Sequence, residues 1–469
     1  MEESSTPKIQ EANALIINVN EIAEIQREAN TSTQTEELHS EANASIENED
    51  RDTQLVNDIT KMLESSEPSL SPKCCIYRVP HDVRKLNEEA YTPQFISIGP
   101  FHHGDKRLEI MEKLKVRYFK QFVKKATLNV KKLVSIVRDK EGDVRRCYAE
   151  SIQLSSDDCV KLILMDASFI IVFFLMCQLE EWRSDDDLIV VTPRMMTTIV
   201  KDMWLLENQL PFFVIKEIFN FAFGSFSNFP SFAQLIFGFF RGYNTKKMSP
   251  DPNLEIMHFL DLLRTFFLPQ SRRLPQRGND VGVKPLYSAS HLHDAGVKFK
   301  VGLSKCLFDL KFTNGVLEIP CLKLYNDTES LFGNLVALEQ YRYLFDAYVT
   351  DYICVLDFLI DTVTDVDLLV GNKILVNGLG DSNAVTTLVN NLSKNNVTYL
   401  NSNSNYCNLY EDLNTFYFRH IWKARFRRDY FATLRRDFLS TPWITASTIG
   451  AIILLVLTLI QTVCSIISL

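Results

Sequence analysis

The 469-residue chain lacks the sequence patterns of the common catalytic classes. It has no glycine-rich phosphate loop ending in Lys-Ser or Lys-Thr and no complete G-x-G-x-x-G, and Gly378-Leu379-Gly380 is only a turn signal. Neither the G-x-S-x-G of a hydrolase nor the H-E-x-x-H of a zinc protease occurs. Nucleotide hydrolysis and the standard hydrolase mechanisms therefore lose support, no catalytic residue is predicted, and no cofactor is expected.

The pattern of a secretory signal peptide is also missing. The opening residues MEESSTPKIQ are acidic, and no basic segment leads into an apolar one. Ten cysteines run from Cys74 to Cys464 without a repeating spacing. Together these features predict a body outside the secretory lumen, with reduced and mostly structural thiols. Five Asn-x-Ser/Thr sequons would matter only in a lumenal body: Asn30, Asn43, Asn326, Asn391 and Asn396.

Charge is absent from residues 442–469, within which residues 449–460 read IGAIILLVLTLI. At ~1.5 Å per residue a helix of this length extends roughly 40 Å, which exceeds the ~30 Å hydrocarbon core of a bilayer. The alternative, a buried core helix, needs neighbours that wrap every face. The segment therefore predicts a single transmembrane helix that anchors the tail in a membrane.

Basic residues precede this apolar segment, and no Lys or Arg follows it. They are Arg419, Lys423, Arg425, Arg427, Arg428, Arg435 and Arg436. Together with Trp443 at the segment's start, this flank predicts a body in the cytosol and a surface for anionic lipid. The sequence does not choose between the plasma membrane and the endoplasmic reticulum. Ala446 and Gly450 leave self-association through the tail open beside chance spacing.

The remaining chain divides into an arm and a body. Residues 1–72 are rich in Glu, Asn, Ser and Thr and poor in aromatics, which predicts a disordered acidic arm. Residues 73–438 read as a mainly helical body. Within it, residues 299–324 alternate around Asn314-Gly315, which predicts a β-hairpin. The expected fold class is mainly α with a small antiparallel sheet (α+β).

Three segments of the body carry particular expectations. Cys159–Leu179 is apolar on nearly every face but contains Asp166, so it predicts a buried core helix rather than a second span. Asp105 is placed to cap a helix whose outer faces carry Lys and Arg. Residues 207–209, Glu-Asn-Gln, are expected to cap a helix before Pro211 opens the next.

Residues suited to zinc occur near the start of the body. Cys74, Cys75, His81, His102 and His103 could gather around this metal, because thiolates and imidazoles are its ligands. Their spacing fits no established zinc pattern, and a turn closed by the two adjacent histidines is the simpler interpretation. No metal site is predicted.

A second cluster is acidic. Asp357, Asp361 and Asp365 recur every four residues and would share one face of a helix, with Asp367 following. Such a stripe would suit a metal-dependent enzyme, whereas a solvated face or pairing with Lys and Arg is the alternative. Nucleic-acid binding is not expected, because the formal net charge is -8 and a membrane anchor restricts access.

Ordered sequence blocks along the body resemble a plant family known only as domain of unknown function 247, or uncharacterised protein family 0481. The blocks are CCIYRVP at 74–80, YTPQFISIGPFHHG at 91–104, WLLENQLPFF at 204–213, DAGVKFK at 294–300, NGVLEIP at 314–320, LFGNLVALEQ at 331–340 and YCNLYEDLN at 406–414. One block departs from the family pattern, because Ala167 and Ser168 replace the usual Gly and Cys.

The resemblance implies a plant origin and a C-terminal membrane helix but no known activity. Since some grass members are implicated in pollen self-incompatibility, it also makes a role in recognition or signalling an expectation. The sequence hypothesis is a membrane-tethered, non-enzymatic interaction protein with unknown protein partners. The alternative is a metal-dependent enzyme that uses the clustered Asp or His residues.

Overall fold

The computed structural model describes residues 51–62, 71–183, 187, 189, 192–226, 229–251, 254–269, 286–394, 404–433 and 442–467. The chain forms two compact units, residues 1–70 and 71–469. In the first unit, residues 51–62 form a helix with exposed side chains. The predicted disorder of the arm falls largely outside the described residues and stays a prediction.

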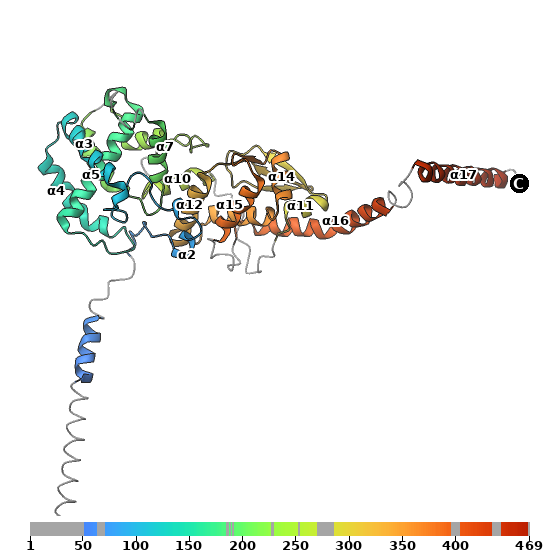
Figure 1. Ribbon diagram of the computed structural model, residues 1–469, viewed down its shortest axis with the longest axis horizontal. Coiled ribbons are helices and arrows are strands. Elements are labelled where there is room, and N and C mark those ends of the chain that lie inside the picture. The colour runs from blue at the N-terminus through green and yellow to red at the C-terminus, as the bar shows by residue number, and fades with distance from the viewer. Residues whose placement is uncertain are drawn as a thin grey trace, which may run out of the picture. The chain divides into compact units, whose positions relative to one another are not determined.

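The second unit is mostly helical (Figure 1). Its first elements, with 3-10 helices marked η, are α2 (His81–Arg84), η1 (Glu88–Ala90), η2 (Lys106–Leu108), α3 (Glu109–Lys125), α4 (Val130–Arg145), α5 (Ser156–Gln178), η3 (Glu180–Trp182), α7 (Pro193–Asp202), α8 (Phe212–Phe223), α9 (Phe232–Phe239) and α10 (Phe259–Phe267). The later ones are α11 (Ala289–Asp294), β1 (Lys298–Gly302), β2 (Lys311–Thr313), β3 (Val316–Pro320), β4 (Leu322–Leu324), α12 (Thr328–Arg342), α13 (Tyr348–Leu359), α14 (Val363–Gly371), β5 (Leu375–Asn377), α15 (Ser382–Lys394), α16 (Cys407–Thr433) and α17 (Pro442–Ile467).

Helix α5 forms the centre of the first half of the body. Ser155 caps its N-terminus by accepting a hydrogen bond from the Asp158 N–H. Because its apolar residues cover nearly every face, it needs neighbours all round, and α3, α4, α8 and α9 pack against it. The prediction that this segment is a core helix is confirmed.

Phenylalanine rings fill the space around α5. Phe173 and Phe174 contact Phe239 at centroid distances of 5.5 and 4.3 Å, and Phe174 also contacts Phe259 at 5.4 Å. Such edge and tilted contacts add to the area that each ring buries. The phenylalanines of α8, α9 and α10 are therefore largely core, although Phe226, in the loop after α8, is 58% exposed.

The predicted hairpin is present. Strands β2 and β3 pair antiparallel, and Asn314 and Gly315 form the two-residue turn with φ of 51° and 78°. Both values lie in the left-handed region that type I′ turns require, which explains the Asn-Gly pair. A Cβ at Gly315 would lie 3.0 Å from the Phe416 ring, so this turn also abuts α16.

The expectation that the small sheet is antiparallel holds only for the pair β2–β3. β1 pairs with β3 in parallel, giving the mixed order β1-β3-β2, and β4 pairs in parallel with β5. The alternating apolar pattern reports that a segment is a strand, but it does not report the direction of its partner. The fold class of a mostly helical protein with small sheets stands.

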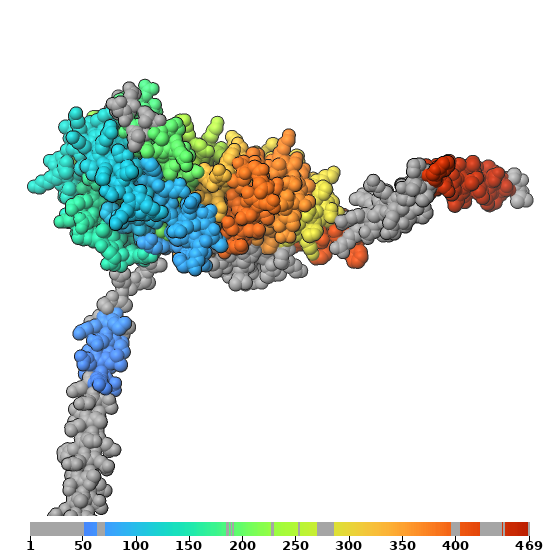
Figure 2. All heavy atoms as spheres, in the orientation of Figure 1, coloured from blue at the N-terminus to red at the C-terminus, as the bar shows by residue number. Residues whose placement is uncertain are grey.

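The later helices complete the same body. Helix α12 contacts α10 and η1 from the first half and α13 and α15 from the second. In the space-filling view the early elements of the second unit, light blue to green, and its later ones, yellow to orange, meet in one continuous surface (Figure 2). The body core therefore runs through both halves.

Candidate functional site

The C-terminal helix α17 is the first candidate site. Its stretch Ala446–Ile467 is long and apolar enough to cross a membrane, and none of it is buried. The large aliphatic side chains from Ile449 to Ile467 are each about half exposed or more. Length and composition alone give weak evidence, because α5 passes the same test yet is a core helix whose apolar stretch is 89% buried.

The predicted membrane flank is only partly described. Arg425, Arg427 and Arg428 belong to the described backbone of α16, but their side chains lie outside the described residues, as do Arg435 and Arg436 entirely. Trp443 lies in the first turn of α17 and is 86% exposed. The arginines' role toward lipid therefore stays a prediction.

A buried polar network lies inside the body, built on the segment that joins α7 to α8. Glu207, Asn208 and Gln209 do not cap a helix, because α7 has already ended at Asp202 and Pro211 is the N-cap residue of α8. All three side chains are instead almost fully buried. Buried polar groups are stable only when hydrogen-bonded, so their partners explain the segment.

Asn208 joins its own segment to the stretch preceding the histidine turn. Its Oδ1 accepts from the Ile98 N–H at 2.7 Å, and its Nδ2 donates to the carbonyl oxygens of Ile96 and Asp202, each at 2.9 Å. One amide side chain thus replaces a β-ladder between two irregular segments. Ile96 and Ile98 lie about 110 residues before Asn208 along the chain.

Gln209 closes the next layer of the network. Its Nε2 donates to the carbonyl oxygens of Met203 and Leu205, each at 2.7 Å, while its Oε1 accepts from the Phe259 N–H at 3.0 Å. Its own carbonyl lies 2.4 Å from the position of a Cβ at Gly99. Gly99, with φ of 75°, is therefore required both by backbone conformation and by space.

Glu207 receives the charged members of the network. Its Oε1 accepts from the Val79 N–H at 2.7 Å and from the Arg84 guanidinium, and the His102 ring lies 3.2 Å from its Oε2. Burial alone would raise the pKa of Glu207, but the nearby His102 ring, the Arg84 charge and the Val79 N–H outweigh it and lower the pKa. Glu207 is therefore ionised and holds the body's first segment in place.

A second buried charge pair links α3 to α5. Lys115 lies 2.6 Å from Asp166, and its amino group donates to the Ser97 carbonyl at 2.6 Å. Asp166 also accepts from the Gly99 N–H at 2.7 Å. Burial opposes the charge on Lys115, but the carboxylates of Asp166 and Glu112 raise its pKa. The polar residue that interrupts α5 is thus paired, as a core helix requires.

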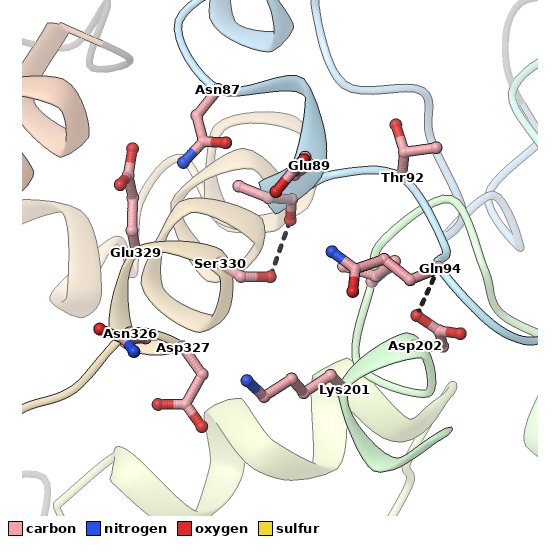
Figure 3. Close-up of a pocket in the computed structure, with 12 residues that line it drawn as sticks. Asn87, Glu89, Thr92, Gln94, Lys201, Asp202, Asn326, Asp327, Glu329 and Ser330 are labelled. Carbon is pink, nitrogen blue, oxygen red and sulfur yellow. Dashed lines mark hydrogen bonds between the residues drawn. The ribbon is translucent and has the colours of Figure 1, made fainter. Parts of the chain in front are cut away.

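A small cavity adjoins this network (Figure 3). It has a volume of about 130 Å³ and lies among η1, the end of α7 and the start of α12. Lys201 and Asp327 point toward one another across it, and Ser330 donates to the Ala90 carbonyl at 2.8 Å. Pockets for ordinary organic substrates measure roughly 300–1,000 Å³, so this one suits only water or a small polar group.

The five residues considered as zinc ligands do not gather. Cys74 and Cys75 are buried in the core, His81 and His103 are exposed, and His102 faces Glu207. Within the described residues, no group of three or more His, Cys, Asp or Glu is placed to hold a metal ion. The simpler interpretation holds in part, since His102 lies in the 101–104 turn and faces a carboxylate.

The interpretation that Asp357, Asp361 and Asp365 share one face of a helix is wrong. Asp357 belongs to α13, which ends at Leu359, whereas Asp365 belongs to α14. Asp365 is fully buried and forms a capping box with Thr362, accepting from its N–H and hydroxyl at 2.8 Å each. The sequence Thr-x-x-Asp at 362–365 is the pattern of such a cap. Because a new helix begins there, the three aspartates do not lie on one helix.

Capping was predicted correctly at Asp105, whose side chain accepts from the Arg107 N–H at 2.9 Å. By contrast, three residues of the buried network had no signal of their role, because the side chain of each binds backbone far away in sequence. Glu207 accepts from the Val79 N–H, Asp202 accepts from the Phe95 N–H at 2.7 Å, and Asn334 donates to the Ala90 carbonyl at 2.9 Å. A polar run inside an otherwise apolar segment, such as LLENQLPFF, is the only hint that they are buried.

These features define the class: a mainly helical α+β body followed by a helix apolar enough to span a membrane. The model of a family described as plant protein of unknown function (DUF247) matches residues 76–457, and the chain belongs to that family. The resemblance inferred from the sequence blocks is therefore confirmed.

Two curated relatives are similar over most of their length. The UPF0481 protein At3g47200 of Arabidopsis thaliana is 29% identical over 432 residues, which cover 84% of this chain and 87% of the relative. The putative UPF0481 protein At3g02645 of the same plant is 22% identical, with 82% and 89% covered. No solved structure matches the chain.

Proposed function

We propose that this chain is a membrane-tethered, non-enzymatic interaction protein, with its body in the cytosol and α17 crossing the membrane. The observation that carries the proposal is the uncovered apolar surface of α17. Each aliphatic side chain left in water forgoes about 1.5–3 kcal/mol of burial, so an uncharged helix of this length calls for an apolar surrounding. A bilayer supplies it.

The interaction role has support in a turn of the body that buried side chains hold by hydrogen bonds and an ion pair. Arg264 and Glu339 form a buried ion pair at 2.9 Å, and Arg264 also donates to the Asp346 carbonyl. Tyr343 donates to Asp261 at 2.7 Å, which holds the same turn from within. On its outside, Leu344 and Phe345 are 54% and 78% exposed.

A fixed turn that displays large apolar side chains has the character of a binding hot spot, because little conformational freedom is lost when a partner covers it. We therefore assign partner binding to the surface formed by Leu344 and Phe345. The role in plant cell recognition or signalling belongs to this proposal and follows only from the family resemblance.

Proximity labelling tests the function with three forms of the chain. The full chain is compared with one lacking residues 442–469 and with one whose α17 is replaced by an unrelated membrane span. We expect the replaced form to keep the partners of the full chain and the deleted form to lose those near the membrane. Identical partner sets for the full and deleted chains would contradict tethering as the mode of action.

The Leu344/Phe345 surface is tested in the full chain by the double substitution Leu344→Ser/Phe345→Ser. Leu303→Ser is the matched control, because Leu303 is a 98% exposed apolar residue that lies in the loop after β1. We expect the double variant to lose labelled partners while the control keeps them and both bodies stay folded. Unchanged partners in the double variant would exclude this surface.

The orientation is tested with sequons. Asn326 is exposed in a turn of the body, so it reports the compartment of the body, and a sequon added after Leu469 reports the other side. We expect only the added sequon to be glycosylated, detected as a mass shift that an endoglycosidase removes. Glycosylation at Asn326 would reverse the topology.

A further inference from the structure

Helix α16 has one face that packs against the body. Tyr410, Leu413, Tyr417 and Ile421 recur at helical spacing and are buried. Tyr287 stacks on Tyr417 with ring centroids 3.7 Å apart, and α16 contacts α11 and β2. These contacts fix the orientation of the helix up to Ile421 and therefore decide which side chains face outward.

The outward face of α16 changes its chemistry along the helix. Glu411 and Asp412 are exposed near its start, which makes that end acidic. One to three turns later the exposed residues are Phe418, Arg419 and Trp422, with Phe418 57% and Trp422 76% exposed. At ~1.5 Å per residue, the change from carboxylates to aromatics and a cation takes only about 9 Å.

Core packing does not account for the aromatic end of this face. Phe418 touches Tyr287 and Tyr417 edge-on yet keeps more than half of its surface exposed. Trp422 is a large ring with an indole N–H and is still more exposed. Rings with a polar group, next to a cation, are enriched where membrane proteins meet the headgroup region.

The position of this face in the chain brings it near a membrane. The helix continues from Trp422 to Thr433, roughly 16 Å at ~1.5 Å per residue. Residues 434–441 then separate it from α17, and eight residues can span at most about 28 Å. The sequence between Trp422 and Thr433 adds Lys423, Arg425, Arg427 and Arg428, so positive charge increases toward the span.

We propose that the α16 face formed by Phe418, Arg419 and Trp422 docks on the anionic headgroups of the bilayer that α17 crosses. This inference deepens the proposed function and rests on it. The aromatic rings enter the interfacial layer, the Arg419 guanidinium binds lipid phosphate, and the acidic start of the helix stays away from the negative surface. Docking would fix the tilt of the body on its membrane.

Tryptophan fluorescence of the full chain in lipid vesicles tests the proposal. The Trp422 signal is isolated as the difference between the chain and its Trp422→Phe variant, because the chain has four tryptophans. Vesicles contain phosphatidylcholine alone or with phosphatidylserine, and acrylamide quenching measures exposure to water. We expect quenching of Trp422 to fall about twofold when phosphatidylserine is present, and high salt to restore it.

Charge reversal supplies the variant and its control. Arg419→Glu keeps the reporter and is expected to abolish the effect of phosphatidylserine. Lys120→Glu makes the same change of charge at an exposed position of α3, away from this face, and is expected to leave the effect in place. An equal loss in both variants would show a general charge effect and overturn the site.

The outcomes separate this inference from the proposed function. If the chain does not float with vesicles of either composition, tethering by α17 fails. If it floats but Trp422 is equally quenched in both vesicles, the tether stands and the docked face is overturned. Shielding of Trp422 that follows protein concentration rather than lipid charge would assign the face to a second copy of the chain and also overturn lipid docking.

Discussion

Helices α5 and α17 have nearly the same apolar character and opposite surroundings. Both are long and apolar enough to cross a membrane, but 89% of the apolar stretch of α5 is buried and none of that of α17 is. α5 carries Asp166, which Lys115 neutralises from α3, whereas α17 carries no charged residue. The comparison teaches that a paired charge and neighbours on every face distinguish a core helix from a span, while composition does not.

The largest expected effect comes from a charge placed in the middle of α5. Ile170 is fully buried, so Ile170→Arg puts a cation into the core without a partner. We expect the free energy of unfolding to fall by more than about 4 kcal/mol, which is enough to unfold many domains. Circular dichroism and protease sensitivity of the full chain measure it. A folded Ile170→Arg body would break the comparison, because α5 would then not be core.

Removing half of the buried pair should have the next largest effect. Burial raises the pKa of Asp166, so Lys115→Met leaves its carboxyl buried without the cation that opposes this shift, and such changes cost about 3–5 kcal/mol. The double variant Lys115→Met/Asp166→Asn keeps an acceptor for the Gly99 N–H and should regain much of that loss. Chemical denaturation measures both. Equal stability of the single and double variants would show that the charge on Asp166 is not what matters.

The same kind of charge in α17 should act differently. Leu454→Arg is expected to weaken membrane insertion by about 2.5–3.5 kcal/mol, the cost of Arg at the centre of a span. The body should unfold at the same denaturant concentration as before, because Leu454 is 66% exposed and packs on none of it. Insertion is measured by flotation. A loss of body stability would mean that α17 packs on the body.

A change of pH should alter the stability of the body through a buried carboxyl, whereas α17 has no side chain that titrates in this range. Asp202 accepts hydrogen bonds from the backbone N–H groups of Gln94, Phe95 and Ile96, and burial raises its pKa from 3.8 to about 6. When the pKa of a carboxyl is higher in the folded than in the unfolded protein, the folded state is favoured most where the carboxyl is protonated in both states. The contribution of Asp202 to the free energy of unfolding is therefore greatest below its unfolded pKa of 3.8 and is lost as the pH rises to about 6. At about 1.4 kcal/mol per pKa unit, the change is at most about 3 kcal/mol.

Asp202→Asn is the reference for this prediction, because it cannot titrate at that position. The difference in free energy of unfolding between the two proteins is expected to shift against Asp202 between pH 4 and pH 6. Denaturation at a series of pH values measures it. A difference that is constant with pH, or that moves the other way, would show that the three backbone N–H groups outweigh burial.

Local patterns in the sequence predicted the local structure. Three predictions depend on residues within a few positions of one another, and each is confirmed. They are the core helix α5 with apolar residues on nearly every face, the Asn-Gly turn of the hairpin and the Asp105 cap. The apolar tail was also evident, because α17 needs no partner from the body to be recognised.

Features that depend on distant partners were missed or misread. The parallel pairing of β1 with β3 requires knowing which edge of β3 is free after the hairpin forms. Glu207 was taken as part of a cap because its partners Val79 and Arg84 lie more than 120 residues earlier. The acidic stripe failed for a local reason, since Thr362 and Asp365 start a new helix.

Alkaline extraction of membranes tests the central claim most directly, namely that α17 and not α5 is the span. The full chain and the chain lacking residues 442–469 are compared after membranes are opened at high pH. The account predicts that the full chain stays in the membrane pellet and that the deleted chain moves entirely to the supernatant with a folded body. A deleted chain that remains in the pellet would contradict it.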